Sequence, residues 1–365
     1  MRRANAKLVA ILSAMCGLAL GATALPALAA APKRIVLLIN GTAGDKSFFD
    51  SAAHGFDLIR AKYGADVVAK VIEMSYDESK WQATAEDIAS QDWDLIVTGT
   101  YQMNDIVAAV ANDNPKKTFV IYDAAMDYSK GGFKNVYSIT YKQNEASYLA
   151  GMVGADMIKS GKAKGTSLGF LGGLDIPVIN DFLTGYVAGA QAVDPAAKVA
   201  VSYIGSFSDA AKGKELALAQ YRTGTAIGFN VAGQAGLGQL AAAKESDHYA
   251  IGVDSDQSAI FRATDPATAD RVVTSVLKRV DTSLLRAYDL FAAGKLPAGH
   301  EEALGLKEGA VGIVENDVYA SLLSADDRAK ISSAAADIAS GKIVVPTAFG
   351  MDTAAMNALR AKVRP

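Results

Sequence analysis

The sequence has 365 residues, of which 50% are hydrophobic and 21% are charged, and its formal net charge is −3. This near-neutral balance excludes the strongly basic field that draws proteins to nucleic acid or anionic lipid. The length exceeds the roughly 250–300 residues that one hydrophobic core serves, so we expect two lobes.

The first 29 residues predict a cleavable signal peptide, and therefore export to the periplasm. Basic residues open the segment, an apolar stretch follows over 8–25, and small residues at 27 and 29 form a cleavage pattern. An uncleaved membrane anchor is the alternative. The single cysteine, Cys16, lies here, and the preceding Met15 argues against a lipid anchor. The chain after cleavage then lacks cysteine, which excludes a disulfide scaffold, a thiol nucleophile and a cysteine-ligated metal.

Apolar runs alternate with amphipathic stretches in the first half of the remaining chain. The predicted strands are 35–39, 67–74, 94–98, 118–122 and 136–140, and the predicted helices between them are 51–63, 78–91 and 101–112. Such alternation is the βαβ signature of a parallel, doubly wound sheet.

The pattern restarts with a long predicted helix over 143–160. Strands are predicted at 167–171, 199–204, 227–231 and 248–253, and helices at 178–193, 210–221, 236–244 and 271–292; the segments 310–314 and 326–340 close the chain. Two successive α/β halves of similar size predict two lobes with a cleft between them, and the chain crosses between lobes near 141–142.

The loop over 41–49 follows the first predicted strand. Asp45 and Ser47 are residue types that cap helix N-termini, and the loop should lie at the carboxyl end of the strand, where open α/β folds bind ligands. An acid, a base and the aromatic pair Phe48 and Phe49 suit a small, polar, ring-containing ligand. The alternative is a capped turn with one phenylalanine packed into the core.

Three aspartates follow predicted strands and should converge on the cleft. Asp45, Asp123 and Asp254 each come at or just after a strand end, and carboxylates accept hydrogen bonds from ligand hydroxyl and amino groups. Each one alone is as easily a helix cap or a turn acid. Lys278, on the predicted helix over 271–292, shares a face with Thr274.

The motifs of an enzyme are missing from the sequence. The three histidines are scattered, and neither a nucleophile elbow nor a Walker phosphate loop is present. The glycine-rich stretch over 233–238 matches a dinucleotide fingerprint only loosely, although its glycines permit close approach of a ligand to the main chain. We therefore expect a binding protein that uses no cofactor and no metal.

Several motifs together resemble the basic membrane protein family of ABC-transporter solute-binding proteins, to which the purine nucleoside receptors belong. The resemblance runs in order through nearly all of the chain after the signal segment. The motifs are 45–48, 144–151, 171–177, 182–189, 205–209 with 212–215, 232–236, 252–257 and 274–279.

The resemblance implies a two-lobed periplasmic binding protein of type I, with a parallel, doubly wound sheet in each lobe and the ligand in the interlobe cleft. The implied first lobe is 30–140 plus 270–300, and the second is 141–269 plus 301–365. The implied partners are a purine nucleoside, an inner-membrane ABC permease and its ATPase. Nothing in the sequence demands more than a monomer.

The resemblance also implies a ligand site. The purine would lie between Phe48 and Phe207, and Asp123 would meet the base or a nearby polar edge. Asp254 and Lys278 would hold the ribose hydroxyls. The nine expected site residues are Asn40, Asp45, Phe48, Phe49, Asp123, Phe207, Gly233 (through its backbone), Asp254 and Lys278.

Two positions in the first loop region depart from the family pattern. Asn40 stands where relatives often have an acid, and Phe49 stands where they often have asparagine, so the accepted base or ligand can differ and Phe49 can replace Phe48 as the stacking ring. A sensory role, or a receptor for a sugar or another heterocycle, is the alternative on the same fold. A nucleoside hydrolase is the third hypothesis.

Overall fold

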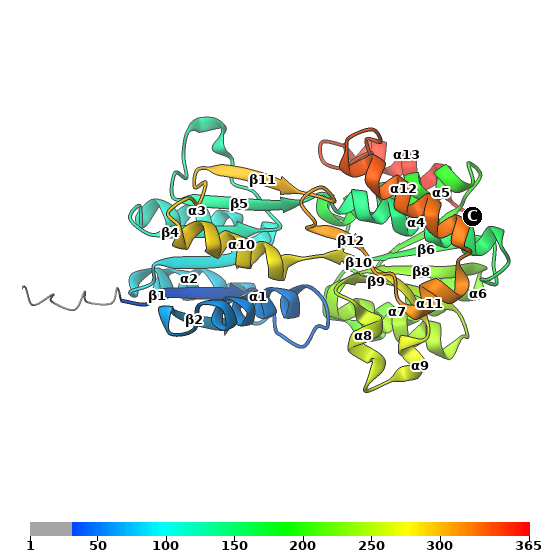
Figure 1. Cartoon of the computed structure of the whole chain (residues 1–365), viewed down its shortest axis with the longest axis horizontal. Coiled ribbons are helices and arrows are strands. Elements are labelled where there is room, and N and C mark those ends of the chain that lie inside the picture. Colours follow the sequence, from blue (N-terminus) through cyan, green and yellow to red (C-terminus); the bar gives the residue numbers. More distant parts are fainter. Residues whose placement is uncertain (1–30) are drawn as a thin grey trace, which may run out of the picture. The chain divides into compact units, whose positions relative to one another are not determined.

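Two six-stranded sheets form the framework of the chain (Figure 1). The computed structural model describes residues 31–365, so the expected signal peptide over 1–29, with Cys16, lies outside the described residues. The α/β architecture with two mainly parallel sheets is confirmed, as are all the strands predicted before residue 254.

The first sheet has the strand order β11-β5-β4-β3-β1-β2, and all its pairs are parallel. Its strands are β1 (Lys33–Ile39), β2 (Val67–Glu73), β3 (Leu95–Gly99), β4 (Thr118–Tyr122), β5 (Val136–Tyr141) and β11 (His300–Leu304). The helices that accompany it are α1 (Phe48–Tyr63), α2 (Trp81–Ser90), α3 (Asn104–Asp113) and α10 (Val280–Ala292).

Strand β1 shows why an unbroken apolar run predicts a central parallel strand. Successive side chains point to opposite faces of a sheet. Ile35 and Leu37 join the core beneath α1 and α10, whereas Val36 and Leu38 join the core beneath α2 and α3. All four are buried, because helices cover both faces.

The second sheet has the order β12-β10-β9-β8-β6-β7, with β12 antiparallel to β10. Its strands are β6 (Ser167–Gly172), β7 (Val199–Tyr203), β8 (Thr225–Val231), β9 (Tyr249–Asp254), β10 (Val272–Lys278) and β12 (Val311–Ile313). Its helices are α4 (Gln143–Lys159), α5 (Pro177–Val193), α6 (Ala210–Arg222), α7 (Gly233–Glu245), α8 (Gln257–Arg262), α9 (Pro266–Ala269), α11 (Asp317–Leu322), α12 (Ala325–Ala339) and α13 (Thr353–Val363).

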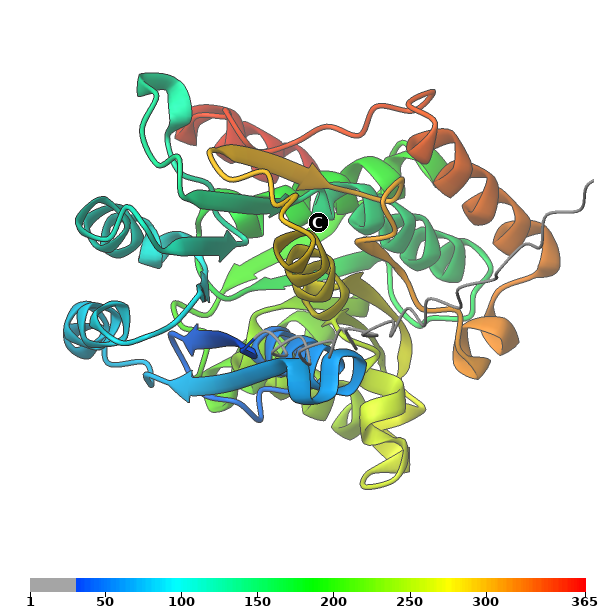
Figure 2. The same ribbon diagram turned by 60° about the vertical axis from the view of Figure 1, so that its left-hand side comes forward.

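Helices α4 and α5 pack unusually closely, and this explains two family motifs. A Cβ at Gly151 of α4 would collide with the carbonyl oxygen of Tyr186, and a Cβ at Gly189 of α5 would collide with that of Tyr148. The C-terminal helices then cover this pair, since α12 contacts α4 and α13 contacts α5 (Figures 1 and 2). These motif glycines therefore serve helix packing.

The structure differs from the sequence prediction between residues 270 and 305. The stretch predicted as a helix over 271–292, and assigned to the first lobe, begins with strand β10, which pairs with β9 in the second sheet. Val272, Val273 and Val276 are buried and β-branched, which favours a strand. Of the stretch over 271–292, only α10 packs with the first sheet, through α1, and β11 then joins that sheet beside β5.

The chain passes between the two sheets three times. It leaves the first sheet after β5, returns after β10, and leaves again between β11 and β12. We define the first lobe as residues 33–141 plus 280–304, and the second lobe as 142–279 plus 305–365.

Candidate functional site

All nine residues expected at the ligand site line one cavity between the two sheets. Its volume is about 340 Å³. The nine are Asn40, Asp45, Phe48, Phe49, Asp123, Phe207, Gly233, Asp254 and Lys278. The cavity wall also contains residues that the sequence analysis did not propose as ligand contacts: Tyr76, Trp81, Thr100, Tyr101, Ile176 and Phe182.

Three cavity residues other than glycine have a left-handed backbone. The φ angle is 71° at Thr100, 57° at Asp123 and 63° at Asp254. Thr100 follows β3, Asp123 follows β4 and Asp254 ends β9. Such conformations cost roughly 1–3 kcal/mol each and gather at functional sites. Strain and polar side chains thus coincide at the carboxyl edges of both sheets, where open α/β folds bind ligands.

Asp45 shapes the first loop. Its carboxylate accepts hydrogen bonds from the backbone N–H groups of Ser47 (3.0 Å), Phe49 (2.9 Å) and Asp50 (3.1 Å). Burial raises the pKa of Asp45, and these three backbone donors oppose the rise. The carboxylate therefore fixes the start of α1, and most of its acceptor capacity is already used.

The two phenylalanines of the loop have different environments. Phe49 is 7% exposed, and its ring lies against Gly41, where a Cβ would collide with it. Phe48 is half-buried, with its ring 5.4 Å from Phe49 and 5.5 Å from Tyr122 between centroids. The ring of Phe48 is therefore more accessible than that of Phe49, and the Phe49 ring packs against it.

Two polar pairs join the lobes at the cavity. Ser47 Oγ of the first lobe donates to Asp254 Oδ2 of the second at 2.5 Å. Lys278 Nζ of the second lobe donates to Asp123 Oδ1 of the first at 2.7 Å. Both pairs contain groups that we expect to contact the ligand. The same groups therefore form contacts between the two lobes.

Burial dominates the titration of these acids. It raises the pKa of Asp254 to about 6, against the opposing effects of Lys278 and Ser47. Burial also raises the pKa of Asp123, and the ammonium of Lys278 opposes that rise. Three aspartates thus face one buried lysine in the cavity wall, so the wall favours hydrogen-bond donors over anions.

Asn40 presents an unused acceptor. Its Nδ2 donates to Thr100 Oγ1 at 2.8 Å, its side chain is 2% exposed, and its Oδ1 has no partner among the described residues. A buried acceptor without a partner costs free energy unless a ligand or water supplies a donor. The departure from the family pattern thus places a buried acceptor without a partner among the described residues on a residue of the cavity wall.

The second-lobe wall holds Phe207 and Gly233 together. The Ala235 N–H in the first turn of α7 donates to the Phe207 carbonyl oxygen at 2.8 Å. The Phe207 ring also lies against Gly173, where a Cβ would collide with it. Gly233 has φ 53° and starts α7, so its backbone is accessible at a helix N-terminus.

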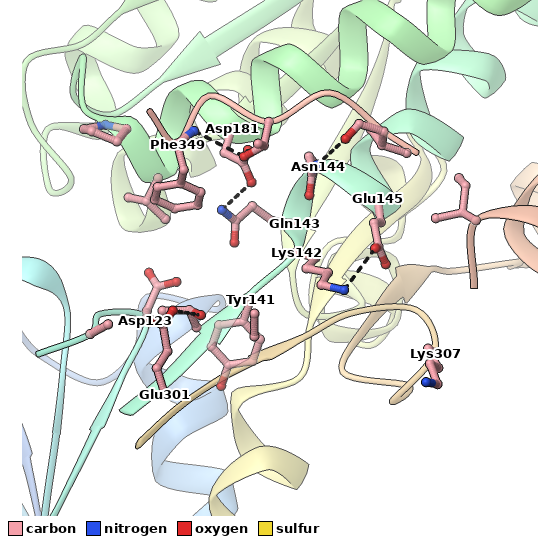
Figure 3. Close-up of a pocket in the computed structure, with 18 of the residues that line it drawn as sticks. Asp123, Tyr141, Lys142, Gln143, Asn144, Glu145, Asp181, Glu301, Lys307 and Phe349 are labelled. Carbon is pink, nitrogen blue, oxygen red and sulfur yellow. Dashed lines mark hydrogen bonds and ion pairs between the residues drawn. The ribbon is translucent and has the colours of Figure 1, made fainter. Parts of the chain in front are cut away.

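A second cavity, of about 900 Å³, adjoins the first (Figure 3). Its polar groups mostly bind one another: Gln143 Nε2 donates to Asp181 Oδ2 at 2.7 Å, and Asp181 Oδ1 also accepts from Thr347 Oγ1 and the Ala348 N–H. Asn144 Nδ2 donates to the Val345 carbonyl oxygen. These bonds fasten the C-terminal segment to α4 and α5, so this cavity borders a structural junction.

Within residues 31–365, no three His, Cys, Asp or Glu side chains are arranged to hold a metal ion. No helix in that range is both long and apolar enough to cross a membrane.

Comparison with known proteins gives consistent matches. The sequence model of the family described as ABC transporter substrate-binding protein PnrA-like matches residues 32–347. The ABC transporter nucleoside-binding protein BmpA of Lactococcus lactis is 35% identical over 283 residues, which cover 75% of this chain and 77% of that protein. Basic membrane protein A of Borreliella burgdorferi is 31% identical over 322 residues, which cover 86% and 88%.

A solved structure gives the same result for the fold. An ABC transporter solute-binding protein of Aeropyrum pernix superposes with a TM-score of 0.77 at 25% identity, covering 91% of this chain and 97% of that one. Such proteins are periplasmic or extracellular binding components, not enzymes, and they work with a membrane permease and its ATPase. By the family match over most of its length, this chain belongs to the PnrA-like family of ABC transporter substrate-binding proteins.

Proposed function

We propose that this protein is the receptor of an ABC importer for a purine nucleoside, which it binds in the 340 Å³ cavity. The observation that carries the proposal is the convergence in that cavity of the Phe48 and Phe207 side chains with Asp123, Asp254 and Lys278. The similarity to a nucleoside-binding protein over three quarters of the chain supports it. The volume is near the lower end of the roughly 300–1,000 Å³ usual for ligand pockets, as a small ligand requires.

The aromatic walls suit a heterocyclic base. Phe48 comes from the first lobe and Phe207 from the second, so a planar base between them would contact both lobes. Stacking of a base on an aromatic side chain contributes about 1–3 kcal/mol. Asn40 Oδ1 offers an acceptor for a base N–H, which gives this wall a means to distinguish bases.

The charged groups suit the ribose. Asp254 can accept from sugar hydroxyls, and Lys278 can donate to their oxygens. Hydrogen bonds to charged groups contribute about 1.5–3 kcal/mol each. Stacking and these bonds together can reach the roughly 8 kcal/mol that micromolar binding requires, after ordering costs.

The balance of charge argues against nucleotides. Asp45, Asp123 and Asp254 line the cavity with only one lysine, Lys278, beside them. A phosphate placed beside Asp254 is repelled, so a neutral nucleoside is favoured over its phosphate ester.

Isothermal titration calorimetry of the purified protein with inosine, guanosine, adenosine, cytidine, xylose and free purine bases tests the proposal. We expect at least one purine nucleoside to bind with Kd below about 100 μM and its 5′-monophosphate to bind much more weakly. Binding of xylose or another sugar in place of every purine nucleoside would overturn the assignment. Chromatography of the incubated ligand tests the hydrolase hypothesis, since any turnover contradicts a receptor.

A further inference from the structure

Lys278 is enclosed by aromatic rings, and the proposed function does not account for this. Its side chain is 3% exposed. The ammonium lies 4.9 Å from the ring centroid of Phe182 and 5.6 Å from those of Phe48 and Tyr141. All three distances lie within the roughly 6 Å over which the negative face of an aromatic ring attracts a cation.

The ammonium keeps donors for a ligand. It has three N–H donors, and the structure records one hydrogen bond from it to another described residue, the bond to Asp123. A buried lysine side chain has several rotatable bonds and loses up to ~2 kcal/mol of rotamer freedom when it is fixed. The rings restrict where the ammonium can lie, so its remaining donors stay near the ligand cavity that Lys278 lines.

The surrounding groups divide unequally between the lobes. Phe48, Asp123 and Tyr141 belong to the first lobe, at α1, after β4 and at the end of β5. Phe182 is on α5 and Lys278 ends β10, so both belong to the second lobe (Figure 1). If the lobes separate to admit a ligand, Phe182 is the group that stays with the lysine.

We propose that Phe182 is a positioning residue that holds the Lys278 ammonium in its ligand-binding place even when the lobes are apart. This rests on the proposed function, in which Lys278 binds the ribose. Phe48 and Asp123 then complete the enclosure when the lobes meet. The rotamer entropy of the Lys278 side chain is then lost when the protein folds and not when the ligand binds. The sugar is bound more strongly for that reason.

A purely structural role is the competing explanation. Phe182 is 1% exposed and packs edge-to-face with Phe229, with ring centroids 6.1 Å apart. Phe229 is fully buried and packs against Phe170 and Tyr186, and within residues 31–365 no lysine or arginine lies over its ring. It is therefore the matched control, being a core phenylalanine of the same cluster without the lysine contact.

Stepwise fluorination of the ring distinguishes the two explanations. Fluorine substituents withdraw electrons and weaken the negative electrostatic potential of the ring face, with little change of volume. Mono-, di- and trifluorophenylalanine are introduced at position 182 and, in parallel, at position 229. With the trifluoro ring at 182 we expect about three- to tenfold weaker binding of the ribonucleoside, graded with fluorine number. The free base, which lacks the sugar, should keep its affinity, and fluorination at 229 should change neither.

A second readout needs no ligand. Ring currents from the enclosing faces should displace the Lys278 ε-methylene proton resonances upfield, and their assignment follows from their loss in Lys278→Met. In Phe182→Met, which keeps most of the volume without a ring, they should move downfield, and Phe182→Tyr should restore them. Thermal unfolding shows which variants remain folded.

Four outcomes are distinguishable. Loss of ribonucleoside affinity specific to position 182, with an unchanged free base, supports the inference. Equal losses at 182 and 229, or equal losses for nucleoside and base, overturn it. An unshifted Lys278 resonance in Phe182→Met also overturns it. Absence of nucleoside binding by the unmodified protein overturns the proposed function, while the resonance shift still tests the placement of the lysine by Phe182.

Discussion

The two adjoining cavities differ in what their polar groups do. The larger, of about 900 Å³, is bordered by Asp181, whose carboxylate is bound by Gln143, Thr347 and Ala348. The smaller cavity, of about 340 Å³, is lined by Asn40, whose Oδ1 has no partner among the described residues, and by Lys278, whose ammonium donates one hydrogen bond, to Asp123. The larger cavity also has buried polar atoms without such a partner, Asn104 Oδ1 and Gln143 Oε1. The buried Lys278 together with Phe48 and Phe207, and not volume, therefore distinguishes the proposed ligand site.

The largest effect is expected from removal of the buried lysine. Lys278→Met leaves Asp123 without its ion pair and removes a donor to the sugar, so we expect about 100-fold weaker nucleoside binding and a lower melting temperature. Lys330→Met, which removes an exposed partner of Asp327, is the control and should change neither by much. Calorimetry and thermal unfolding measure both. An unchanged affinity in Lys278→Met would place the ligand outside this cavity.

Asp254→Ala should come next. Loss of a charged acceptor costs about 2 kcal/mol, or roughly 30-fold in Kd for a ribonucleoside, and much less for the free base. Asp326→Ala removes an exposed acid that lines neither cavity and serves as the control. Equal losses for nucleoside and base would mean that Asp254 does not recognise the sugar.

The pH dependence of binding should be smaller and follows from the pKa of Asp254, which burial raises to about 6. If the carboxylate accepts from the sugar, affinity should fall below pH 6, by about tenfold at pH 5. Calorimetry from pH 5 to pH 8 measures this, and Asp254→Asn should flatten the profile. A profile equally steep in Asp254→Asn would assign the effect to Asp45 or Asp123, whose pKa values burial also raises.

The same shift predicts an opposite trend for the stability of the ligand-free protein. Between the ordinary value of 3.8 and about 6, the folded state holds a proton on Asp254 that the unfolded state has released. The contribution of this group to stability is therefore present at low pH and decreases as pH rises through that window. The difference in unfolding free energy between the protein and Asp254→Asn, measured across pH 4 to 7, checks the sign.

The smallest effect on binding is expected in the larger cavity. Asp181→Ala removes a carboxylate that accepts three hydrogen bonds, so the free energy of unfolding should fall by about 2 kcal/mol. Nucleoside affinity should change less than about twofold, because Asp181 does not line the smaller cavity. A large loss of affinity with unchanged stability would reverse the roles of the two cavities.

Patterns along the chain predicted most of the fold, since strands buried on both faces appear as unbroken apolar runs. Two strands show the limit. The helix predicted over 271–292 begins with strand β10, and the shared face of Thr274 and Lys278 does not distinguish the two, because a spacing of four places residues on one face in a strand and in a helix alike. β11 has the sequence His-Glu-Glu-Ala-Leu and joins the sheet edge with help from Arg286, which binds Glu302. Nothing in so polar a segment indicates a strand.

The site was predictable where its residues follow strands, as Asp123 and Asp254 do. Contacts set by tertiary packing were not. The sequence does not show that Thr100 Oγ1 accepts a hydrogen bond from the Asn40 amide group, or that the Phe182 ring lies over the Lys278 ammonium. It also does not show that Phe49 packs inward while Phe48 stays available.

The left-handed residues at the strand ends have a consequence for how this protein can change. At Thr100, Asp123 and Asp254, a glycine would adopt the observed φ without strain. Glycine at position 123 would, however, leave the buried Lys278 without its ion pair, and glycine at position 254 would remove the acceptor of the Ser47 hydroxyl. Relief of backbone strain and loss of side-chain contacts therefore act in opposite directions on stability at these strand ends.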